Sequence, residues 1–271
     1  MGFKQLLAKP FRDSARVNRE VMLGMLRPLQ GRFLELGPGA APLLDQLPHI
    51  ALQDKLVVEF PGVIDFCRQK GFTCFAQDLG TERWAVPDAS IDVVLSSQVL
   101  EHIPNTDHVM LETWRVLKPG GYVLVSVPNQ TALAYVLMML LTFNPPMNMV
   151  SDNFYGLGNP FSTRRFQHSA EFGTAGHGHL RLFAMRAMLD LMKVYGFTIA
   201  ARHGGTTGLP LLGRWFARIF PYYGLLTIVL ARKPLGAGGA TSSTARGLSA
   251  TPRWKLPESG HMTDHGPIHR A

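Results

Sequence analysis

The chain contains a glycine-rich turn that directly follows a short apolar segment. Glu35 lies near the end of the segment Arg32–Leu36, and Gly37 and Gly39 lie in the turn. Because glycine has no β-carbon, a ligand can approach the backbone closely here, and a helix that begins after the turn would offer free N–H groups to it. Such a turn alone indicates a ligand site only weakly.

Two carboxylates follow the turn, near the ends of the next two apolar segments. Glu59 comes twenty positions after Gly39, and Asp78 lies just beyond the segment Thr73–Ala76. In doubly wound sheets a carboxylate at the first of these positions hydrogen-bonds a ribose. The turn and the two acids together predict a nucleoside site, with helix caps or solvated loop acids as the alternative for each acid taken singly.

Residues beside the turn indicate which cofactor would fit. A dinucleotide site would have Gly or Ala three positions after Gly39, where this chain has Pro42. Glu35 would repel a pyrophosphate, but it suits a ligand that carries an ammonium and a sulfonium group. We therefore expect S-adenosylmethionine rather than a nicotinamide dinucleotide.

A second polar group lies far along the chain, in the run His177-Gly-His179-Leu-Arg181. An imidazole can take the proton of an acceptor hydroxyl near neutral pH. His179, with His177, is the candidate base or substrate contact, and Arg181 is a candidate clamp for an anion or carboxylate. The alternative is a structural loop histidine with a solvated arginine. No cysteine or carboxylate lies at ligand spacing from these histidines, so we predict no metal site.

A parallel sheet would bring these residues together. Short apolar segments alternate with helical patterns, which predicts parallel strands with right-handed crossovers. The segments between strands are predicted to be helices, including Thr106–Leu117 and Phe183–Tyr195, and a helix capped by Ser14 precedes the sheet and runs to about Leu29. The predicted strands are Arg32–Leu36, Leu56–Phe60, Thr73–Ala76, Ile91–Ser96, Tyr122–Val127, Phe197–Ala201 and Leu225–Ala231.

Five segments stand out in order along the part of the chain that runs roughly from Phe33 to Pro128. They are ELGPGA at 35–40, VVE at 57–59, QDL at 77–79, SIDVVLSSQVLEHIP at 90–104 and VLKPGGYVLVSVPN at 116–129. In their order and spacing they resemble the class I S-adenosylmethionine-dependent methyltransferases of the type-11 family. The resemblance departs at Ala41, where many members have a third glycine, and at Val58, where a glycine often precedes the acidic strand end.

The resemblance implies an α/β fold with a doubly wound, seven-stranded, mostly parallel sheet of the Rossmann-like methyltransferase type, with the last strand antiparallel. The alternation of strands and helices breaks after Asn129, and we interpret this break as an inserted lid. The resemblance also implies roles for residues around the cofactor. The implied roles are the methionine end for Glu35, Gly37 and Gly39, the ribose hydroxyls for Glu59, the adenine for Asp78 and Leu79, and the border of the transfer site for Asp92, Ser96 and Ser97.

The predicted organisation is a helical arm at 1–31, a methyltransferase domain at 32–233 and a disordered tail at 234–271. Within the domain, the lid occupies 131–176, and a second insertion with apolar and basic residues occupies 205–224. The tail is rich in small and polar residues and poor in aliphatic ones, so it buries too little apolar surface to offset its ordering entropy.

The charge distribution bears on partners. The net charge is +8, of which residues 1–32 carry +5 and residues 232–271 carry +4, leaving −1 between them. The core is therefore close to neutral, and we expect no nucleic-acid partner. The basic ends and the stretch 209–223, which has the composition of an interfacial helix, favour peripheral membrane contact instead.

The location is predicted to be cytoplasmic, with contact at the inner face of the membrane. Cys67 and Cys74 form no disulfide framework, the N-terminus lacks the features of a secretory signal, and the apolar run Ala132–Phe143 is too short to span a bilayer.

The sequence thus predicts an S-adenosylmethionine-dependent methyltransferase acting on a hydrophobic or amphipathic small molecule, such as an isoprenoid, polyketide, lipid or lipid-linked glycan, by O-methylation. The alternative is an inactive S-adenosylmethionine-binding partner or regulatory protein.

Overall fold

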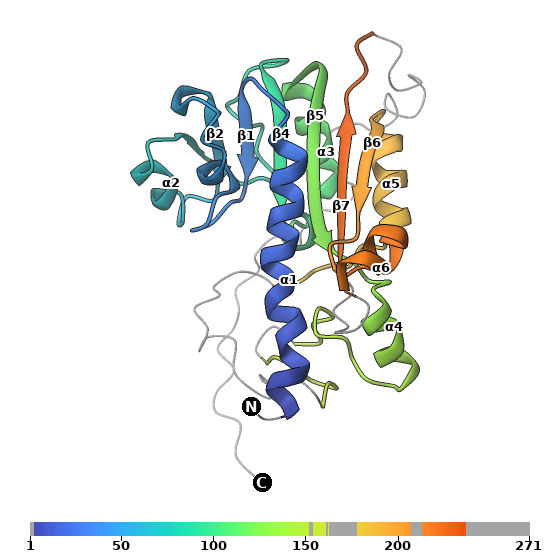
Figure 1. Cartoon of the computed structure of the whole chain (residues 1–271). Helices are drawn as coiled ribbons and strands as arrows, with labels where there is room; N and C mark the ends of the chain where they lie inside the picture. Colours follow the sequence, from blue (N-terminus) through green and yellow to red (C-terminus); the bar gives the residue numbers. More distant parts are fainter. Residues whose placement is uncertain (1–2, 152–153, 161, 163–177, 207–212, 237–271) are drawn as a thin grey trace, which may run out of the picture.

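A computed structural model of the chain describes residues 3–151, 154–160, 162, 178–206 and 213–236. Its centre is a seven-stranded sheet in the order β3-β2-β1-β4-β5-β7-β6 (Figure 1). The strands from β3 to β5 pair in parallel, and β7 runs antiparallel to both β5 and β6. This confirms the predicted mostly parallel sheet. The strands are β1 Phe33–Leu36, β2 Lys55–Glu59, β3 Thr73–Ala76, β4 Ile91–Ser97, β5 Leu117–Pro128, β6 Thr198–His203 and β7 Leu226–Arg232.

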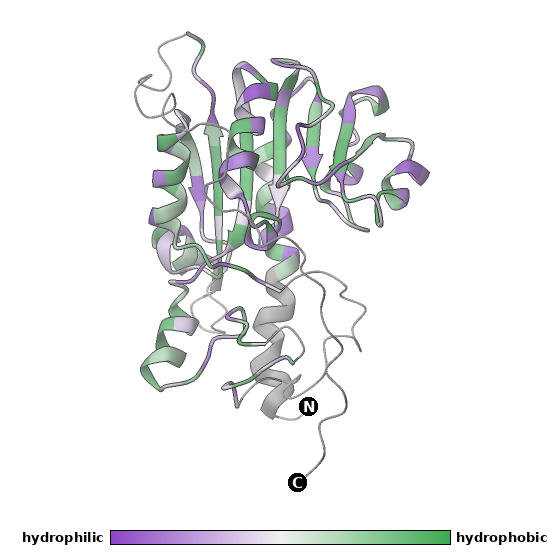
Figure 2. Ribbon diagram, turned by 180° about the vertical axis from the view of Figure 1, so that it is seen from behind, coloured by the Kyte–Doolittle hydropathy of each residue, from purple (hydrophilic) through white to green (hydrophobic). Residues whose placement is uncertain are grey.

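Alternation along the strands builds a core on each face of the sheet. Leu34 of β1 and Val94 of β4 face one core, where α3 (Thr106–Val116) and α5 (Met185–Val194) pack. Phe33 and Val93, their neighbours in sequence, face the other core, which contains α1 (Phe3–Leu26). The central strands are hydrophobic along their length, whereas α5 has one apolar and one polar side (Figure 2). The sheet is therefore covered on both faces.

The helices differ from the prediction more than the strands do. α1 begins at Phe3, well before the predicted cap at Ser14, and it ends at Leu26. The connection from β1 to β2 contains only the 3-10 turns η1 (Leu43–Gln46) and η2 (Leu52–Asp54), because Pro42 and Pro48 interrupt any longer helix. The prediction of a helix after the glycine turn was wrong in this respect.

α2 (Asp65–Gln69) is a short helix between β2 and β3, and Gly71 follows it with φ +79°. The connection from β3 to β4, residues 77–90, contains no helix at all, although one was predicted. The parallel crossovers on this side of the sheet are thus made mainly of turns.

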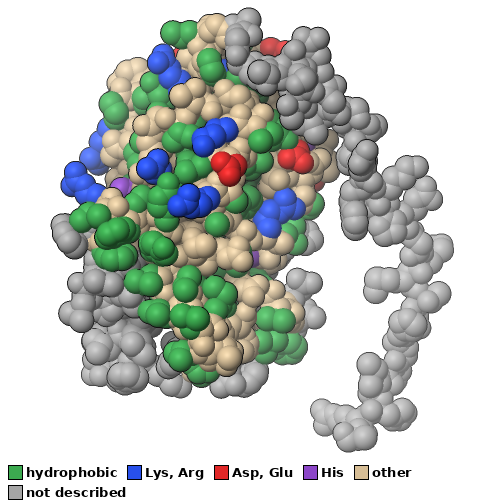
Figure 3. Space-filling model, turned by 90° about the vertical axis from the view of Figure 1, so that its right-hand side faces the viewer, with side chains coloured by type: hydrophobic (Ala, Val, Ile, Leu, Met, Phe, Trp, Pro, Cys, Tyr) green, Lys and Arg blue, Asp and Glu red, His purple; other side chains and the backbone are tan. Residues whose placement is uncertain are grey.

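The described part of the insertion begins with α4 (Leu133–Leu140), which lies beyond the carboxyl edge of the sheet, near α6 (Gly213–Ile219) (Figure 1). Ala132, Ala134 and Tyr135 pack on Leu225, which precedes β7. Hydrophobic side chains gather over the lower half of this flank of the molecule, below several Lys and Arg side chains (Figure 3). Within the described ranges, no helix is both long enough and apolar enough to cross a bilayer.

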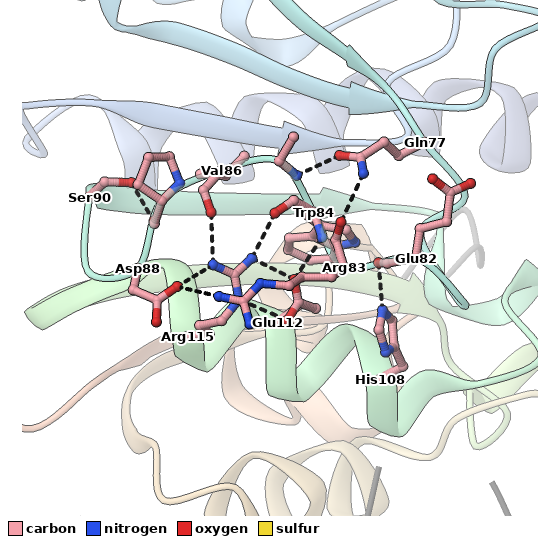
Figure 4. A network of polar contacts seen from close by, with 12 residues as sticks. Gln77, Glu82, Arg83, Trp84, Val86, Asp88, Ser90, His108, Glu112 and Arg115 are labelled. Atoms are coloured by element: carbon pink, nitrogen blue, oxygen red, sulfur yellow. Dashed lines mark hydrogen bonds and ion pairs between the residues drawn. The ribbon is translucent and has the colours of Figure 1, made fainter. Parts of the chain in front are cut away.

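A network of polar contacts fixes the connection from β3 to β4 against α3 (Figure 4). Arg115 of α3 donates to both carboxylate oxygens of Glu112, at 2.6 and 2.8 Å, and to Asp88 at 2.6 Å. The same guanidinium donates to the carbonyls of Trp84 and Val86, while Glu112 accepts the backbone N–H of Trp84 at 2.8 Å. These bonds tie a helix-free loop to the last turn of α3.

Candidate cofactor and acceptor site

A cavity of about 320 Å³ opens at the carboxyl end of the central strands. Open α/β sheets bind ligands at this edge, at the point where the connections from two neighbouring strands run to opposite faces of the sheet. The lining residues are Ala15, Asn18, Arg19 and Met22 of α1; Glu35, Pro38, Ala41 and Leu43 of the glycine turn and its flanks; Ser97, Gln98, Ser126 and Pro128 at the ends of β4 and β5; Tyr135 and Met147 of the insertion; and Leu225 and Leu226 near the start of β7.

The turn glycines have left-handed backbone conformations. Gly37 has φ +55° and donates its N–H to the Val58 carbonyl at 2.9 Å, and a β-carbon there would lie 3.1 Å from a methyl of Val99. Gly39 has φ +58°, and a β-carbon there would meet nothing within 4 Å. Both conformations favour glycine, and the space beside Gly39 leaves its backbone open to a ligand.

Glu35 is buried in the cavity wall. Its two carboxylate oxygens accept the N–H groups of Leu43 and Leu44 at 2.8 and 3.0 Å. Burial raises the pKa of Glu35 to about 7, although both hydrogen bonds and the charge of Arg19 act in the opposite direction. A cationic ligand in the cavity would favour the ionised form of this carboxylate.

The two strand-end acids lie where the sequence predicted them. Glu59 ends β2, and its oxygens accept the N–H groups of Gly39 and Phe60, both at 2.7 Å. Asp78 accepts the N–H of Gly80 at 2.7 Å, and Leu79 beside it is buried. A carboxylate oxygen can accept more than one hydrogen bond, so these contacts leave capacity for ribose or adenine donors. The roles of these residues stay predictions.

β4 places its polar residues at opposite ends. Ser96 is buried, and its hydroxyl has no hydrogen-bond partner within the described part of the chain. Ser97 lines the cavity. Asp92, in contrast, lies at the start of β4, where it accepts the N–H of Arg32 at 2.8 Å and pairs with Lys118 at 2.7 Å. The prediction that Asp92 borders the transfer site was wrong, because this carboxylate lies at the amino edge of the sheet.

The histidine run is placed only in part, since His177 lies outside the described residues. His179 is half-buried behind the cavity wall, and its Nδ1 lies 2.9 Å from the carbonyl of Met147, which lines the cavity. Burial lowers the pKa of His179. Arg181 donates to Thr106 Oγ1 at 3.0 Å and to the Pro104 carbonyl at 2.7 Å, so its guanidinium ties two loops together and is not aimed at the cavity.

Several cavity residues were missed from the sequence. Asn18 and Arg19 line the cavity, but α1 was treated as an arm outside the domain. Tyr135 is the one hydroxyl-bearing side chain within the apolar stretch of α4, which was a usable signal. Glu101, which does not line the cavity, is completely buried and was also missed.

The described residues fit S-adenosylmethionine. Four residues lie together at the carboxyl edge of the sheet: the buried Glu35, Gly37 and Gly39 in left-handed conformations, and Glu59 at the end of β2. The backbone at Gly39 faces open space. This donor set suits a cationic nucleoside.

Comparisons with known proteins agree with this interpretation. A family model described as a methyltransferase domain matches residues 11–201. A probable S-adenosylmethionine-dependent methyltransferase of Mycolicibacterium smegmatis is 35% identical over 126 residues, which cover 45% of this chain and 40% of that protein. A ubiquinone biosynthesis O-methyltransferase of Brucella melitensis is 29% identical over 119 residues, covering 42% and 48%. The matches thus span less than half the length of either relative.

Two solved structures share the fold. A methyltransferase from Mesorhizobium loti has a TM-score of 0.52 at 18% identity, covering 80% of this chain and 97% of that one. A methyltransferase from Thermotoga maritima has a TM-score of 0.51 at 17% identity, covering 85% and 97%. The family model matches most of this chain, from residue 11 to residue 201. The chain therefore belongs to the class I S-adenosylmethionine-dependent methyltransferases.

Proposed function

We propose that the protein transfers a methyl group from S-adenosylmethionine to a hydroxyl oxygen of a hydrophobic or amphipathic small molecule. The observation that carries the proposal is the composition of one cavity. Glu35 and the glycine turn form one side of it, and Tyr135, Met147 and Leu225, which are mostly apolar, form another. A polar cofactor side and an apolar acceptor side therefore meet in the same space.

The cofactor side is assigned to residues of this chain. Glu35 would pair with the ammonium group, and the backbone at Gly37 and Gly39 would accommodate the methionine end. Glu59 would accept from the ribose hydroxyls, and Asp78 with Leu79 would hold the adenine. When bound, S-adenosylmethionine supplies a methyl group already activated by the sulfonium, so the protein mainly has to align the acceptor oxygen with it.

The acceptor is assigned by the walls on the far side of the cavity. Tyr135 is buried and Met147 half-buried, and together with Leu225 they present a mostly apolar surface. Such walls suit isoprenoid, polyketide or lipid-linked acceptors. The relatives named as ubiquinone biosynthesis O-methyltransferases support a hydroxyl as the acceptor group.

Peripheral contact with the cytoplasmic face of a membrane belongs to the same proposal. Exposed apolar side chains lie on and just after α4, whose Tyr135 lines the cavity, and at the end of α6; among them are Leu140 and Leu141, which are 74% and 63% exposed. An acceptor dissolved in lipid would reach the cavity from this flank, which Figure 3 shows.

The test is a two-step assay on the full chain. The first step measures S-adenosylmethionine binding by calorimetry, and the second measures transfer of a labelled methyl group to a panel of polyprenyl phenols, polyketides and lipid-linked glycans. We expect micromolar binding and transfer to at least one acceptor, with both lost in Gly39→Val, because that side chain would fill the open space beside the turn.

Asp65→Asn is the matched control, since Asp65 lies on α2 and pairs only with Arg68 among the described residues. Binding without transfer to any acceptor would favour the regulatory alternative. Absence of binding to the unaltered chain would overturn the proposed function itself.

A further inference from the structure

We propose that Glu101, His102 and His179 bind a divalent transition-metal ion. One ligand atom from each residue lies within 4.8 Å of the other two. Glu101 and His102 belong to the 3-10 turn η3 (Leu100–His102) that follows β4, and His179 comes from a segment far along the chain. The N–H of Leu180 donates to the Glu101 carbonyl at 2.8 Å, which holds the two segments together.

Glu101 is the unusual member of the group. Its side chain is fully buried, and neither carboxylate oxygen has a hydrogen-bond partner within the described ranges. The His102 ring lies beside it, with Nε2 4.0 Å from Oε1. An ionised carboxylate that is buried without hydrogen bonds destabilises the folded state unless a cation compensates its charge. A bound metal ion would supply that compensation.

His179 is oriented as metal-binding histidines usually are. Its Nδ1 lies 2.9 Å from the Met147 carbonyl oxygen, which can only accept a hydrogen bond. Nδ1 must therefore carry the proton, and in the neutral ring this leaves the lone pair of Nε2 for a metal. The hydrogen bond to a backbone carbonyl also fixes the ring plane. His179 thus acts as a ligand in this proposal, in place of the base predicted from the sequence.

His102 completes the group from the solvent side. Its ring centroid lies 4.9 Å from that of His179, with the planes inclined by 55°. The side chain is 39% exposed, so one side of the cluster is open to solvent and an ion can reach it. Glu101 closes the opposite side.

The donor set determines the class of ion. Two imidazoles and one carboxylate match Zn²⁺ and neighbouring first-row ions, whereas Mg²⁺ and Ca²⁺ prefer oxygen ligands alone. With metal bonds of about 2 Å, the ligand atoms have to approach one another by roughly 1 Å from their present positions. Three protein ligands leave the fourth tetrahedral position to a water or an acceptor oxygen. The cluster lies just behind the acceptor side of the cavity, through the contact of His179 with Met147.

The probe is Co²⁺, titrated into full-length protein after treatment with a chelator, with the visible absorption bands of the ion as the readout. Zn²⁺ is then used in equilibrium dialysis and thermal unfolding. We expect one tightly bound equivalent that is weakened at least about tenfold in Glu101→Gln and His179→Ala, and a rise in unfolding temperature with Zn²⁺ that both variants lose. His49→Ala is the matched control, because it removes a histidine outside the cluster.

The substitution of the buried Glu101 can disturb folding, so a third variant, His102→Ala, is included. His102 is partly exposed, and its loss removes one ligand from the cluster. The proposal fails if the unaltered chain binds no equivalent of Co²⁺ at micromolar concentration. It also fails if Glu101→Gln, His102→Ala and His179→Ala bind Co²⁺ as His49→Ala does. None of these readouts uses an acceptor, so failure of the proposed methyl transfer would leave the metal test intact.

Discussion

The proposed pairing of Glu35 with the ammonium group of the cofactor predicts that cofactor binding depends on pH. The folded pKa of Glu35, about 7, lies above the ordinary value of 4.5, so the free protein loses stability as the pH rises from about 4.5 to about 7 and the buried group ionises. A cationic ligand binds the ionised form. We predict that the affinity for S-adenosylmethionine falls about tenfold from about pH 8 to about pH 6, because the ionised fraction falls by that factor. Calorimetry across this range, with proton release measured in two buffers, checks it.

The comparison variant for Glu35 is Glu35→Gln, which cannot ionise. It should bind the cofactor at least about tenfold more weakly at pH 8, with an affinity that no longer varies with pH. A pH-independent affinity in the unaltered protein would show that Glu35 does not face the ammonium group.

For Asp92 the sequence and the structure lead to different expectations: the sequence places it at the transfer site, and the structure places it at the amino edge of the sheet. In the structure it pairs with Lys118 and caps the N–H of Arg32 at the amino edge of the sheet. Its side chain is 29% exposed, so Asp92→Ala should cost about 1 kcal/mol of unfolding free energy in urea. The dissociation constant of S-adenosylmethionine should stay within about twofold of the unaltered value, and a large loss of affinity would return Asp92 to the site.

At the scale of elements, side-chain contacts of Arg115 fix the connection from β3 to β4, which contains no helix. Arg115 is 15% exposed and Glu112 10%, and the Arg115 guanidinium holds the carbonyls of the helix-free loop. Removing Arg115 leaves two carbonyls without this donor and the partly buried Glu112 carboxylate without a cation, with only the Trp84 N–H still bonded to it. We predict that Arg115→Ala lowers the unfolding free energy by roughly 3 kcal/mol, measured in urea at pH 7. Arg83→Ala, which also contacts Asp88 but is 71% exposed, should cost less than about 1 kcal/mol.

The same network has a defined pH dependence. Burial works against ionisation of Glu112, but its hydrogen bonds with Arg115 and Trp84 outweigh burial and lower its pKa. The stabilisation is therefore present above the unfolded pKa of about 4.5 and is lost as the pH falls through the folded value. The difference in unfolding free energy between Arg115→Ala and the unaltered chain should therefore become smaller in acid. A difference that does not change with pH would mean that the stabilisation does not come from the ionised Glu112.

The strands were predictable from the sequence because their signal is local. Segments such as Leu56–Val58 and Val93–Leu95 are short continuous apolar runs, which is typical of strands buried on both faces. The crossovers were not predictable in the same way. Residues 77–90 are held by side chains of α3, so their conformation depends on Arg115 and Glu112, more than twenty residues farther on.

For the whole molecule, the sheet order explains which site residues the sequence could identify. Glu35 lies in β1, Gly39 follows it and Glu59 ends the adjacent parallel strand β2, so their spacing along the chain is enough to bring them together. The acceptor side and the proposed metal cluster combine segments far apart in sequence. Glu101 meets His179 only because the chain returns to the carboxyl edge after the insertion, and no local pattern encodes that meeting.

The proposed membrane contact depends on the exposed apolar side chains and on the net charge of the whole molecule. Leu140 and Leu141 are 74% and 63% exposed at the end of α4, and Ile219 and Phe220 are 48% and 47% exposed at the end of α6. Inserting one such side chain into lipid contributes about 1.5–3 kcal/mol, and the net charge of +8 adds attraction to anionic lipids. We predict that the chain sediments with anionic vesicles at low salt and less at high salt.

The variant Leu140→Glu with Leu141→Glu should reduce the bound fraction at least about tenfold, because it replaces two exposed apolar groups with charges that anionic lipid repels. Val63→Glu with Phe66→Glu is the control that matches in charge, since both side chains are apolar and exposed, at 41% and 52%, but lie just before and on α2, at the other end of the sheet (Figure 1). Equal losses in both variants would mean that net charge alone drives binding. Loss confined to the α4 variant would mean that this flank faces the membrane, so that a lipid-dissolved acceptor reaches the cavity beside Tyr135 without crossing water.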